Sequence, residues 1–188
     1  MSYPELFIAR HGQTEWNVQR RMQGALDSPL TPLGKDQALN LRRIFLGLDT
    51  AGMTFVSSPQ LRAVHTAAIA FETIAPTIET DTRLREIGVG DWQGQPSDPL
   101  KALVSQPLKH MLHYYDFAPN GETFAGLRLR CEAFLDTLDA PTVIMTHGIT
   151  SRMLRLIALG LENDQLSDLP GGQGIVHHIK GGVQKIIS

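Results

Sequence analysis

The sequence has a single cysteine, Cys131, among its 188 residues. One thiol cannot form an intramolecular disulfide, and a zinc site would have to take its ligands from His, Asp and Glu instead. No stretch approaches the ~20 apolar residues that a membrane-spanning helix needs. The first five residues also lack the basic and apolar segments of a signal peptide. We therefore expect a soluble, cytoplasmic protein with no membrane partner.

Charge of either sign is in short supply. Charged residues make up 19% of the chain, and 17 basic against 19 acidic side chains give a net charge of -2. This balance argues against a nucleic-acid partner, although it is compatible with a local basic pocket. Hydrophobic residues reach 42%, which excludes a disordered chain. The length fits one domain, so we expect a single domain over residues 1–188.

Short apolar runs alternate with helical patterns along the chain. Strands are expected at residues 5–10, 54–57, 77–80, 142–146, 175–179 and 183–187, the last two as a hairpin. Helices are expected at residues 31–48, 59–74, 99–113, 122–138 and 148–159. The alternation predicts an α/β fold in which a mostly parallel sheet is covered by helices on both faces.

Histidine and arginine side chains follow three of the expected strands. The first strand ends in Arg10-His11-Gly12, the second leads into a helix that carries Arg62, and the strand at 142–146 ends in His147-Gly148. In such sheets ligands bind outside the carboxyl ends of the strands. Arginine suits phosphate through its planar fork of donors, and helix N-termini add backbone N–H groups. Any one of these side chains could be structural, but together they predict a phosphate pocket.

A set of motifs in a fixed order resembles the histidine phosphatase superfamily, also called phosphoglycerate mutase-like. The motifs are RHGQTEWN at residues 10–17, Arg20, Gln23-Gly24, SSPQLRA at 57–63, LREIG at 84–88, Trp92-Gln93-Gly94, Gly121-Glu122-Thr123 and THG at 146–148. The matches span residues 6–148, and Ile149 stands where many relatives have a second glycine. The resemblance implies a three-layer α/β/α sandwich with a mostly parallel central sheet.

The same resemblance implies a role for individual residues. His11 would be the nucleophile that forms a phosphohistidine, and Glu86 would protonate the leaving oxygen and then activate water. The phosphoryl oxygens and the substrate would be held by Arg10, Arg62, His147, Asn17, the Gly148 backbone, Gln23 and Gly24. Two guanidinium groups and a protonated imidazole can stabilise the transferred group without magnesium, so no metal and no organic cofactor is expected.

The expected function is that of a metal-independent phosphomonoesterase of the histidine acid phosphatase type, acting on a small phosphorylated metabolite. A cofactor-dependent phosphoglycerate mutase is the alternative. Mutases of this superfamily are longer and carry Arg and Tyr just after the catalytic Glu, where this chain has Ile87-Gly88. A third possibility is a non-catalytic phosphate-binding protein, and the presence of every expected reactive residue argues against it.

Residues 95–120 are predicted to form an insertion that covers the pocket and sets specificity. Its apolar and aromatic residues could form a cap or pack against the domain: Leu103, Val104, Met111, Leu112, Tyr114, Tyr115 and Phe117. His110 and His113 could share a helical face, but a zinc pair is not the favoured interpretation. The oligomeric state stays open, with a homodimer as the guess that general frequencies favour.

Overall fold

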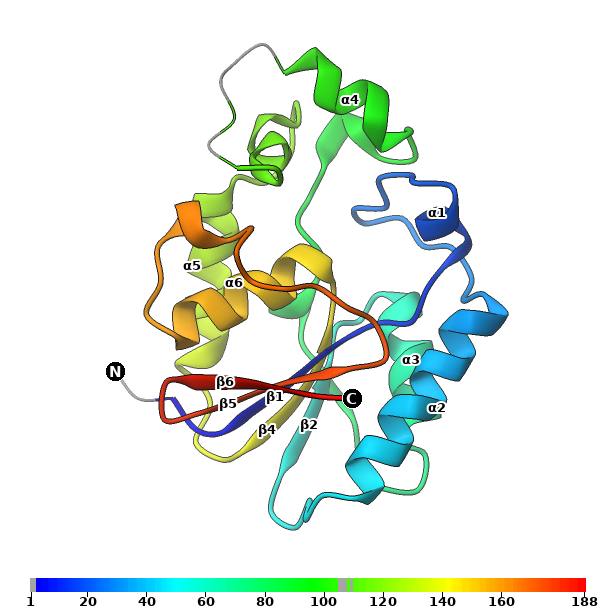
Figure 1. The fold of residues 1–188 in the computed structure, drawn as a ribbon, viewed down its shortest axis with the longest axis vertical. Helices are drawn as coiled ribbons and strands as arrows, with labels where there is room; N and C mark the ends of the chain where they lie inside the picture. The colour runs from blue at the N-terminus through cyan, green and yellow to red at the C-terminus, as the bar shows by residue number, and fades with distance from the viewer. Residues whose placement is uncertain (1–2, 105–107, 109) are drawn as a thin grey trace.

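A six-stranded sheet forms the middle of the computed structural model, which describes residues 3–104, 108 and 110–188 (Figure 1). The strands are β1 (Leu6–Arg10), β2 (Thr54–Ser57), β3 (Glu79–Thr80), β4 (Thr142–Thr146), β5 (Val176–Lys180) and β6 (Val183–Ile187). Their order is β3-β2-β4-β1-β5-β6. The first four pair in parallel, and the hairpin β5–β6 adds antiparallel strands next to β1. The predicted α/β fold and its terminal hairpin are confirmed.

Four helices cover the two faces of the sheet. On one face lie α2 (Pro32–Leu46) and α3 (Leu61–Phe71), and on the other lie α5 (Phe124–Leu135) and α6 (Gly148–Ala158) (Figure 1). Side chains of β1 alternate between the two cores, because successive residues of a strand point to opposite faces. Phe7 packs with the α2–α3 side, whereas Leu6 and Ile8 belong to the α5–α6 side.

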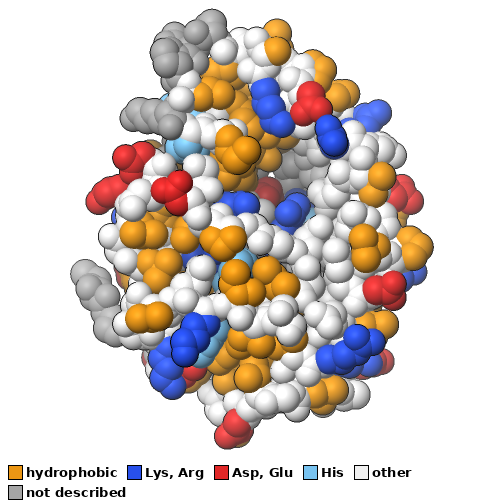
Figure 2. Space-filling model, in the orientation of Figure 1, with side chains coloured by type: hydrophobic (Ala, Val, Ile, Leu, Met, Phe, Trp, Pro, Cys, Tyr) orange, Lys and Arg blue, Asp and Glu red, His pale blue; other side chains and the backbone are white. Residues whose placement is uncertain are grey.

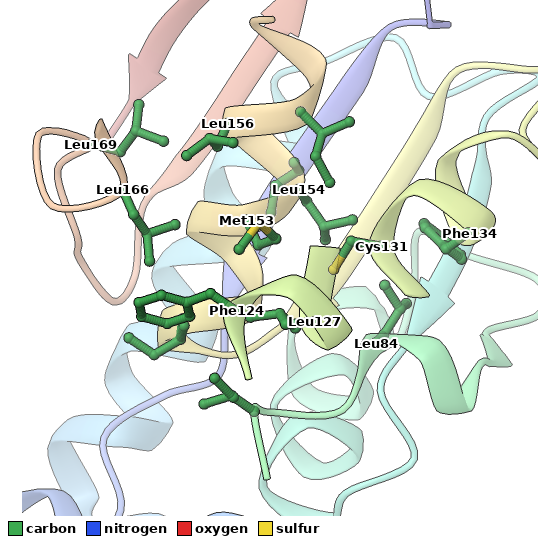
Figure 3. Packing of buried hydrophobic residues seen from close by; sticks show 14 of the residues in the cluster. Leu84, Phe124, Leu127, Cys131, Phe134, Met153, Leu154, Leu156, Leu166 and Leu169 are labelled. Atoms are coloured by element: carbon green, nitrogen blue, oxygen red, sulfur yellow. The ribbon is translucent and has the colours of Figure 1, made fainter. Parts of the chain in front are cut away.

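The core between the sheet and α5–α6 is the larger of the two apolar clusters (Figure 3). Leu127 and Cys131 of α5 face Met153 of α6, and all three are fully buried. Burial raises the pKa of the Cys131 thiol to about 12, so the side chain behaves as a small apolar group. Within the described part of the chain, no helix is long and apolar enough to cross a membrane.

Threonine side chains cap the starts of α1, α2 and α5. Thr31 is the N-cap of α2, and its hydroxyl accepts a hydrogen bond from Gly34 N at 3.0 Å. The short helix α1 (Glu15–Val18) was not expected from the sequence. It is held by a capping box in which Thr14 and Asn17 exchange hydrogen bonds. One turn is too short to show helical periodicity, and the Thr14-x-x-Asn17 spacing was its available signal.

The segment 95–120 departs from the prediction of one helix over residues 99–113. It contains α4 (Ser97–Leu103) and a 3-10 helix, η3 (His113–Phe117). Val104 takes an extended backbone and ends α4, with residues 105–107 and 109 of the expected helix lying outside the described residues. Apolar side chains here divide between packing and solvent, since Leu100 is buried whereas Leu103 is 71% exposed. The apolar residues of this segment therefore do not form the single face that a continuous helix would present.

Two glycines bring the loop after β1 against the start of α2. A Cβ on Gly34 would lie 2.1 Å from Gln13 O, and a Cβ on Gly12 would lie 2.2 Å from Gly34 O. Both contacts involve backbone atoms, so the close approach requires glycine on each side. Thr31 N also donates to Gln13 O at 2.9 Å. The segment that carries His11 is therefore fixed against α2.

Gly34→Ala is expected to lower the free energy of unfolding by about 1–3 kcal/mol, the usual cost of overpacking a tight site. The backbone at Gln13 must move to admit the methyl group. Urea unfolding followed by circular dichroism measures the change. Gly47→Ala is the matched control, because Gly47 has φ -87° and its new Cβ would lie 3.4 Å from Ile44 O. Equal destabilisation of the two variants would contradict the importance of the glycine contact.

Candidate active site

The carboxyl ends of β1, β2 and β4 meet at one edge of the sheet. Arg10 pairs with Thr146, and Ser57 pairs with Met145. The residues that follow these strands are consequently neighbours. The ring centroids of His11 and His147 are 5.2 Å apart. The predicted convergence of the strand ends is therefore present in the structure.

A cavity of about 60 Å³ opens at this edge. A cavity of that volume can hold the few oxygen atoms of a phosphoryl group, but not a whole metabolite. The cavity is lined by Arg10, His11, Asn17, Arg21, Met22, Gln23, Gly24, Arg62, Glu86, Val89 and Tyr115. Figure 2 shows a hollow in this face, near the start of α6, with charged side chains inside it and hydrophobic ones along part of its rim.

His11 is almost completely buried, and its ring is held in one tautomer. Nδ1 lies 2.8 Å from Gly12 O. A carbonyl oxygen only accepts, so Nδ1 carries the proton and Nε2 keeps its lone pair. Burial lowers the pKa of His11 well below its usual value, and the charges of Arg10 and Arg62 lower it further. The ring is therefore neutral near pH 7, with Nε2 as a free nucleophile.

His147 is fully buried beside His11. Its Nε2 lies 2.7 Å from Ser58 Oγ, which also accepts a hydrogen bond from Gln60 N at 3.3 Å. The Ser58 hydroxyl is thus free to donate to Nε2, which leaves the proton of the neutral ring on Nδ1. Burial, followed by the charge of Arg62, lowers the pKa of His147 well below its usual value. His147 is therefore expected to donate from the Nδ1–H of a neutral ring, whereas the sequence alone led us to expect a protonated imidazole.

Arg62 is held by acceptors on one side only. Its NH1 donates to Asp27 Oδ1 at 2.7 Å and to Leu26 O at 2.8 Å, and its NH2 donates to Gly24 O at 2.9 Å. Nε has no partner, although the side chain is 1% exposed. Burial lowers the pKa of Arg62, and Glu86 and Asp27 oppose the shift. The fork is thus fixed by the protein, and Nε keeps its N–H available to donate to a ligand.

Three buried nitrogens lack any hydrogen-bond partner among the described residues: Arg10 Nε, Arg62 Nε and His147 Nδ1. All three belong to residues in or directly beside the cavity. Buried polar groups in native proteins are nearly always paired, because an unsatisfied one costs about 1–3 kcal/mol. Donors that converge on one small cavity indicate a ligand with several acceptor oxygens. A phosphoryl group has that chemistry.

Glu86 reaches the N-terminus of α6. Its Oε1 accepts hydrogen bonds from Thr150 N at 3.1 Å, Thr150 Oγ1 at 3.1 Å and Ile149 N at 3.2 Å. A Cβ on Gly148 would lie 3.5 Å from both Arg10 Nε and Glu86 Oε2. Gly148 therefore admits the guanidinium and the carboxylate to the same small space. The departure at Ile149 leaves its backbone donor to Glu86 intact.

Asn17, Gln23 and Gly24 also line the cavity, as expected. Both hydrogen bonds of the Asn17 side chain use Oδ1, which accepts from Thr14 N at 3.1 Å and Gln173 Nε2 at 3.4 Å. Its Nδ2 is therefore the group left to donate to a ligand. Gln23 is fixed by donating from Nε2 to Thr14 Oγ1 at 2.9 Å.

Two polar residues of the cavity wall, Arg21 and Tyr115, were not singled out by the sequence as individual site residues. Arg21 lines the cavity and donates to Gly94 O at 2.7 Å, whereas the motif residue Arg20 lies outside and pairs with Asp98. Tyr115 is the residue of the expected apolar cap that faces the cavity. Burial raises the pKa of its hydroxyl, so it stays protonated. Neither position stood out, because nothing in the sequence separates Arg21 from Arg20 or Tyr115 from its apolar neighbours.

Three further histidines lie outside the cavity wall. His65 is exposed on α3, and His177 and His178 point to opposite faces of β5. Trp92 is buried and stacks on Tyr114 at 6.4 Å. In residues 3–104, 108 and 110–188, no three His, Cys, Asp or Glu side chains are grouped to hold a metal ion.

These features match a known family. The model described as "Histidine phosphatase superfamily (branch 1)" matches residues 6–184, and the chain belongs to this superfamily. Among curated relatives, the "Probable phosphoglycerate mutase GpmB" of Yersinia pestis (strain Pestoides F) is 36% identical over 166 residues. That match covers 84% of this chain and 75% of the relative.

Solved structures extend the comparison. Bacillus stearothermophilus YhfR has a TM-score of 0.79 and 30% identity, covering 97% of this chain and 95% of that one. A mycobacterial glucosyl-3-phosphoglycerate phosphatase has a TM-score of 0.76 and 28% identity, covering 98% and 96%. The α-ribazole phosphatase of Shigella flexneri has a TM-score of 0.80 at 24% identity over 97% and 94% of the chains, and shows the fold alone.

The lowered pKa values of His11 and His147 predict how stability depends on pH. Both groups titrate below their usual value of 6.5 in the folded protein, so the unfolded chain binds protons more readily. The free energy of unfolding is expected to fall, by up to about 1.4 kcal/mol per pH unit for each such histidine, as the pH drops below 6.5. Urea unfolding between pH 7 and pH 4.5 measures the slope.

His147→Gln should flatten this decline, since glutamine cannot take up a proton. His65→Gln is the matched control and should keep the slope of the natural protein, because His65 is exposed. If His147→Gln shows the same slope as the natural protein, the neutral state assigned to His147 is wrong.

Proposed function

We propose that this protein is a phosphomonoesterase that hydrolyses a small phosphorylated metabolite without a metal ion, through a phosphohistidine on His11. One observation supports the proposal above the others. Three unpaired buried donors belong to residues that line a cavity of phosphoryl size or lie beside it, and the neutral, nucleophilic Nε2 belongs to His11 in the same wall. A site with this composition can both hold a phosphoryl group and react with it.

In the first step the lone pair of His11 Nε2 forms a bond to phosphorus. The bond between phosphorus and the ester oxygen breaks, and its electron pair leaves with that oxygen. Glu86 protonates the leaving oxygen as this happens. Arg10, Arg62 and His147 stabilise the charge on the three equatorial oxygens, which is the main requirement of phosphoryl transfer.

In the second step Glu86 removes a proton from water. The water oxygen attacks phosphorus, the N–P bond breaks, and its electron pair returns to His11 Nε2 while inorganic phosphate departs. The phosphohistidine divides one difficult substitution into two easier ones, and Glu86 serves as the acid in the first and the base in the second. The Glu86 oxygen suited to give and take this proton is Oε2, because it accepts only one hydrogen bond in the described structure, from Ile149 N at 3.2 Å.

A phosphoglycerate mutase is the second candidate, supported by the name of the Yersinia relative. Arg21 in the cavity wall adds one cation that could hold a second acidic group. However, Ile87 is fully buried in the core, so the position directly after Glu86 offers no charge to a substrate. The solved relative named as a glucosyl-3-phosphoglycerate phosphatase supports hydrolysis. We therefore place phosphatase first.

His11→Ala is expected to lower the rate of p-nitrophenyl phosphate hydrolysis by at least about a thousandfold, because it removes the nucleophile of a cooperating set of residues. The assay is run in excess EDTA, with His65→Ala as a matched control that should behave as the natural protein. Undiminished turnover by His11→Ala would refute the proposal. Phosphate binding without turnover by the natural protein would favour a binding role, and interconversion of phosphoglycerates faster than phosphate release would favour the mutase.

Glu86→Gln should have an effect that depends on the leaving group. For an alkyl phosphate, kcat is expected to fall by about 10²–10⁴, because the poor leaving group needs a proton. For p-nitrophenyl phosphate the first step should change far less, since that anion leaves unprotonated. Burst kinetics with both substrates measure this difference. Equal losses in the first step would contradict the role of general acid, and Glu79→Gln, at an exposed position, is the control.

A further inference from the structure

Arg155 is a buried cation that the proposed reaction does not use. The side chain is 1% exposed, and its hydrogen bonds within the described residues all go to uncharged acceptors. Its NH1 donates to His177 Nδ1 at 3.3 Å and to Gln184 Oε1 at 3.1 Å, and its NH2 donates to Pro170 O at 2.8 Å. Burial lowers its pKa to about 9. A buried guanidinium charge needs hydrogen-bond acceptors, and these acceptors of Arg155 are uncharged. One of them, Pro170 O, belongs to a loop.

Side chains from two helices hold that loop, which comprises residues 169–174 and is called here the Gln173 loop. Arg152 Nε donates to Leu169 O at 3.1 Å, and Asn40 Nδ2 donates to Gly174 O at 2.9 Å. Together with the bond from Arg155, these contacts attach the loop to α6 and α2. The loop has no regular secondary structure of its own, so its shape depends on these donors.

Gln173 connects the loop to the candidate active site by hydrogen bonds. Its Nε2 donates to His11 O at 2.9 Å and lies 3.4 Å from Asn17 Oδ1. A side-chain amide has two N–H donors, which match these two acceptors. One group therefore holds the backbone of the nucleophile and occupies the oxygen of Asn17, which turns Asn17 Nδ2 toward the cavity.

We propose that Gln173 is a positioning residue for phosphoryl transfer, and that Arg155 acts through it by holding the Gln173 loop. The inference rests on the proposed function, because the groups that Gln173 fixes are the nucleophile and a phosphoryl donor. Rates of this kind of reaction depend steeply on alignment, and a displacement of about 1 Å can cost on the order of a hundredfold.

The first test compares Gln173→Ala with Gln165→Ala. Gln165 accepts from Glu162 N at 3.0 Å and lies outside the loop, so it is a matched control. Gln173→Ala is expected to lower kcat on p-nitrophenyl phosphate by about ten- to a hundredfold and to weaken binding of inorganic phosphate in calorimetry. Gln165→Ala should change neither value. Unchanged kcat and unchanged phosphate affinity in Gln173→Ala would overturn the inference.

The second test compares Gln173→Glu with Gln173→Ala at different pH values. A purely structural role of Gln173 would not make the ratio of their activities depend on pH. A carboxylate would face two acceptors, His11 O and Asn17 Oδ1, whereas a protonated carboxyl can donate to one of them. The ratio of the kcat of Gln173→Glu to that of Gln173→Ala should therefore rise as the pH falls from 7 to 5. A ratio that does not change with pH would contradict the donor role.

The role of Arg155 is tested by a double-mutant cycle with Arg155→Met. If Arg155 acts through the loop, its replacement should lower kcat in the natural background and add nothing in the Gln173→Ala background. Additive losses would overturn this part. Should Arg155→Met fail to fold, Gln184→Ala, which removes one acceptor of Arg155, replaces it in the same cycle.

The outcomes separate this inference from the proposed function. If the natural protein shows no turnover, the proposed function fails, and the calorimetric comparison of Gln173→Ala with Gln165→Ala decides the positioning role through phosphate affinity. If turnover is normal in both the natural protein and Gln173→Ala, the function stands and the inference fails.

Discussion

The structure depends on the burial of positive charge at one edge of the sheet, where two arginines each keep a guanidinium nitrogen with no hydrogen-bond partner among the described residues. Arg10 and Arg62 lie where water cannot solvate them fully, and each keeps an unpaired Nε. Their field, added to burial, lowers the pKa of His11 and His147. The same arrangement thus provides a neutral nucleophile and donors for an oxyanion. A bound phosphoryl group would satisfy the donors that the fold leaves unpaired.

The rest of the fold keeps these groups in place. Parallel strands bring their carboxyl ends to one edge, and the two apolar cores fix the sheet between its helices. The close contact between Gly12 and Gly34 holds the segment after β1 against α2. Asp27 and the carbonyl of Gly24 hold the fork of Arg62. The buried charge of Arg62 is tolerated because its NH1 and NH2 are hydrogen-bonded to Asp27 and to the backbone carbonyls of Leu26 and Gly24.

The sequence predicted most of the framework, because the relevant residues follow strands. His11 comes directly after β1 and His147 directly after β4, so the convergence of strand ends places them together. The sequence could not predict the contact between Gln173 and His11, because the two residues are 162 positions apart and Gln173 lies in an irregular loop. Hydrophobic periodicity carries no information about such a contact. Nor could it show that His147 is neutral, since that depends on burial and on Ser58.

The most direct test of the central claim is a crystal structure of the protein with orthovanadate, which adopts the geometry of a phosphoryl group in transfer. We expect vanadium bonded to Nε2 of His11, and vanadate oxygens within hydrogen-bond distance of Arg10 Nε, Arg62 Nε and His147 Nδ1. Vanadate bound elsewhere, or bound with these three nitrogens still unpaired, would contradict the claim that the buried donors exist to hold a phosphoryl group.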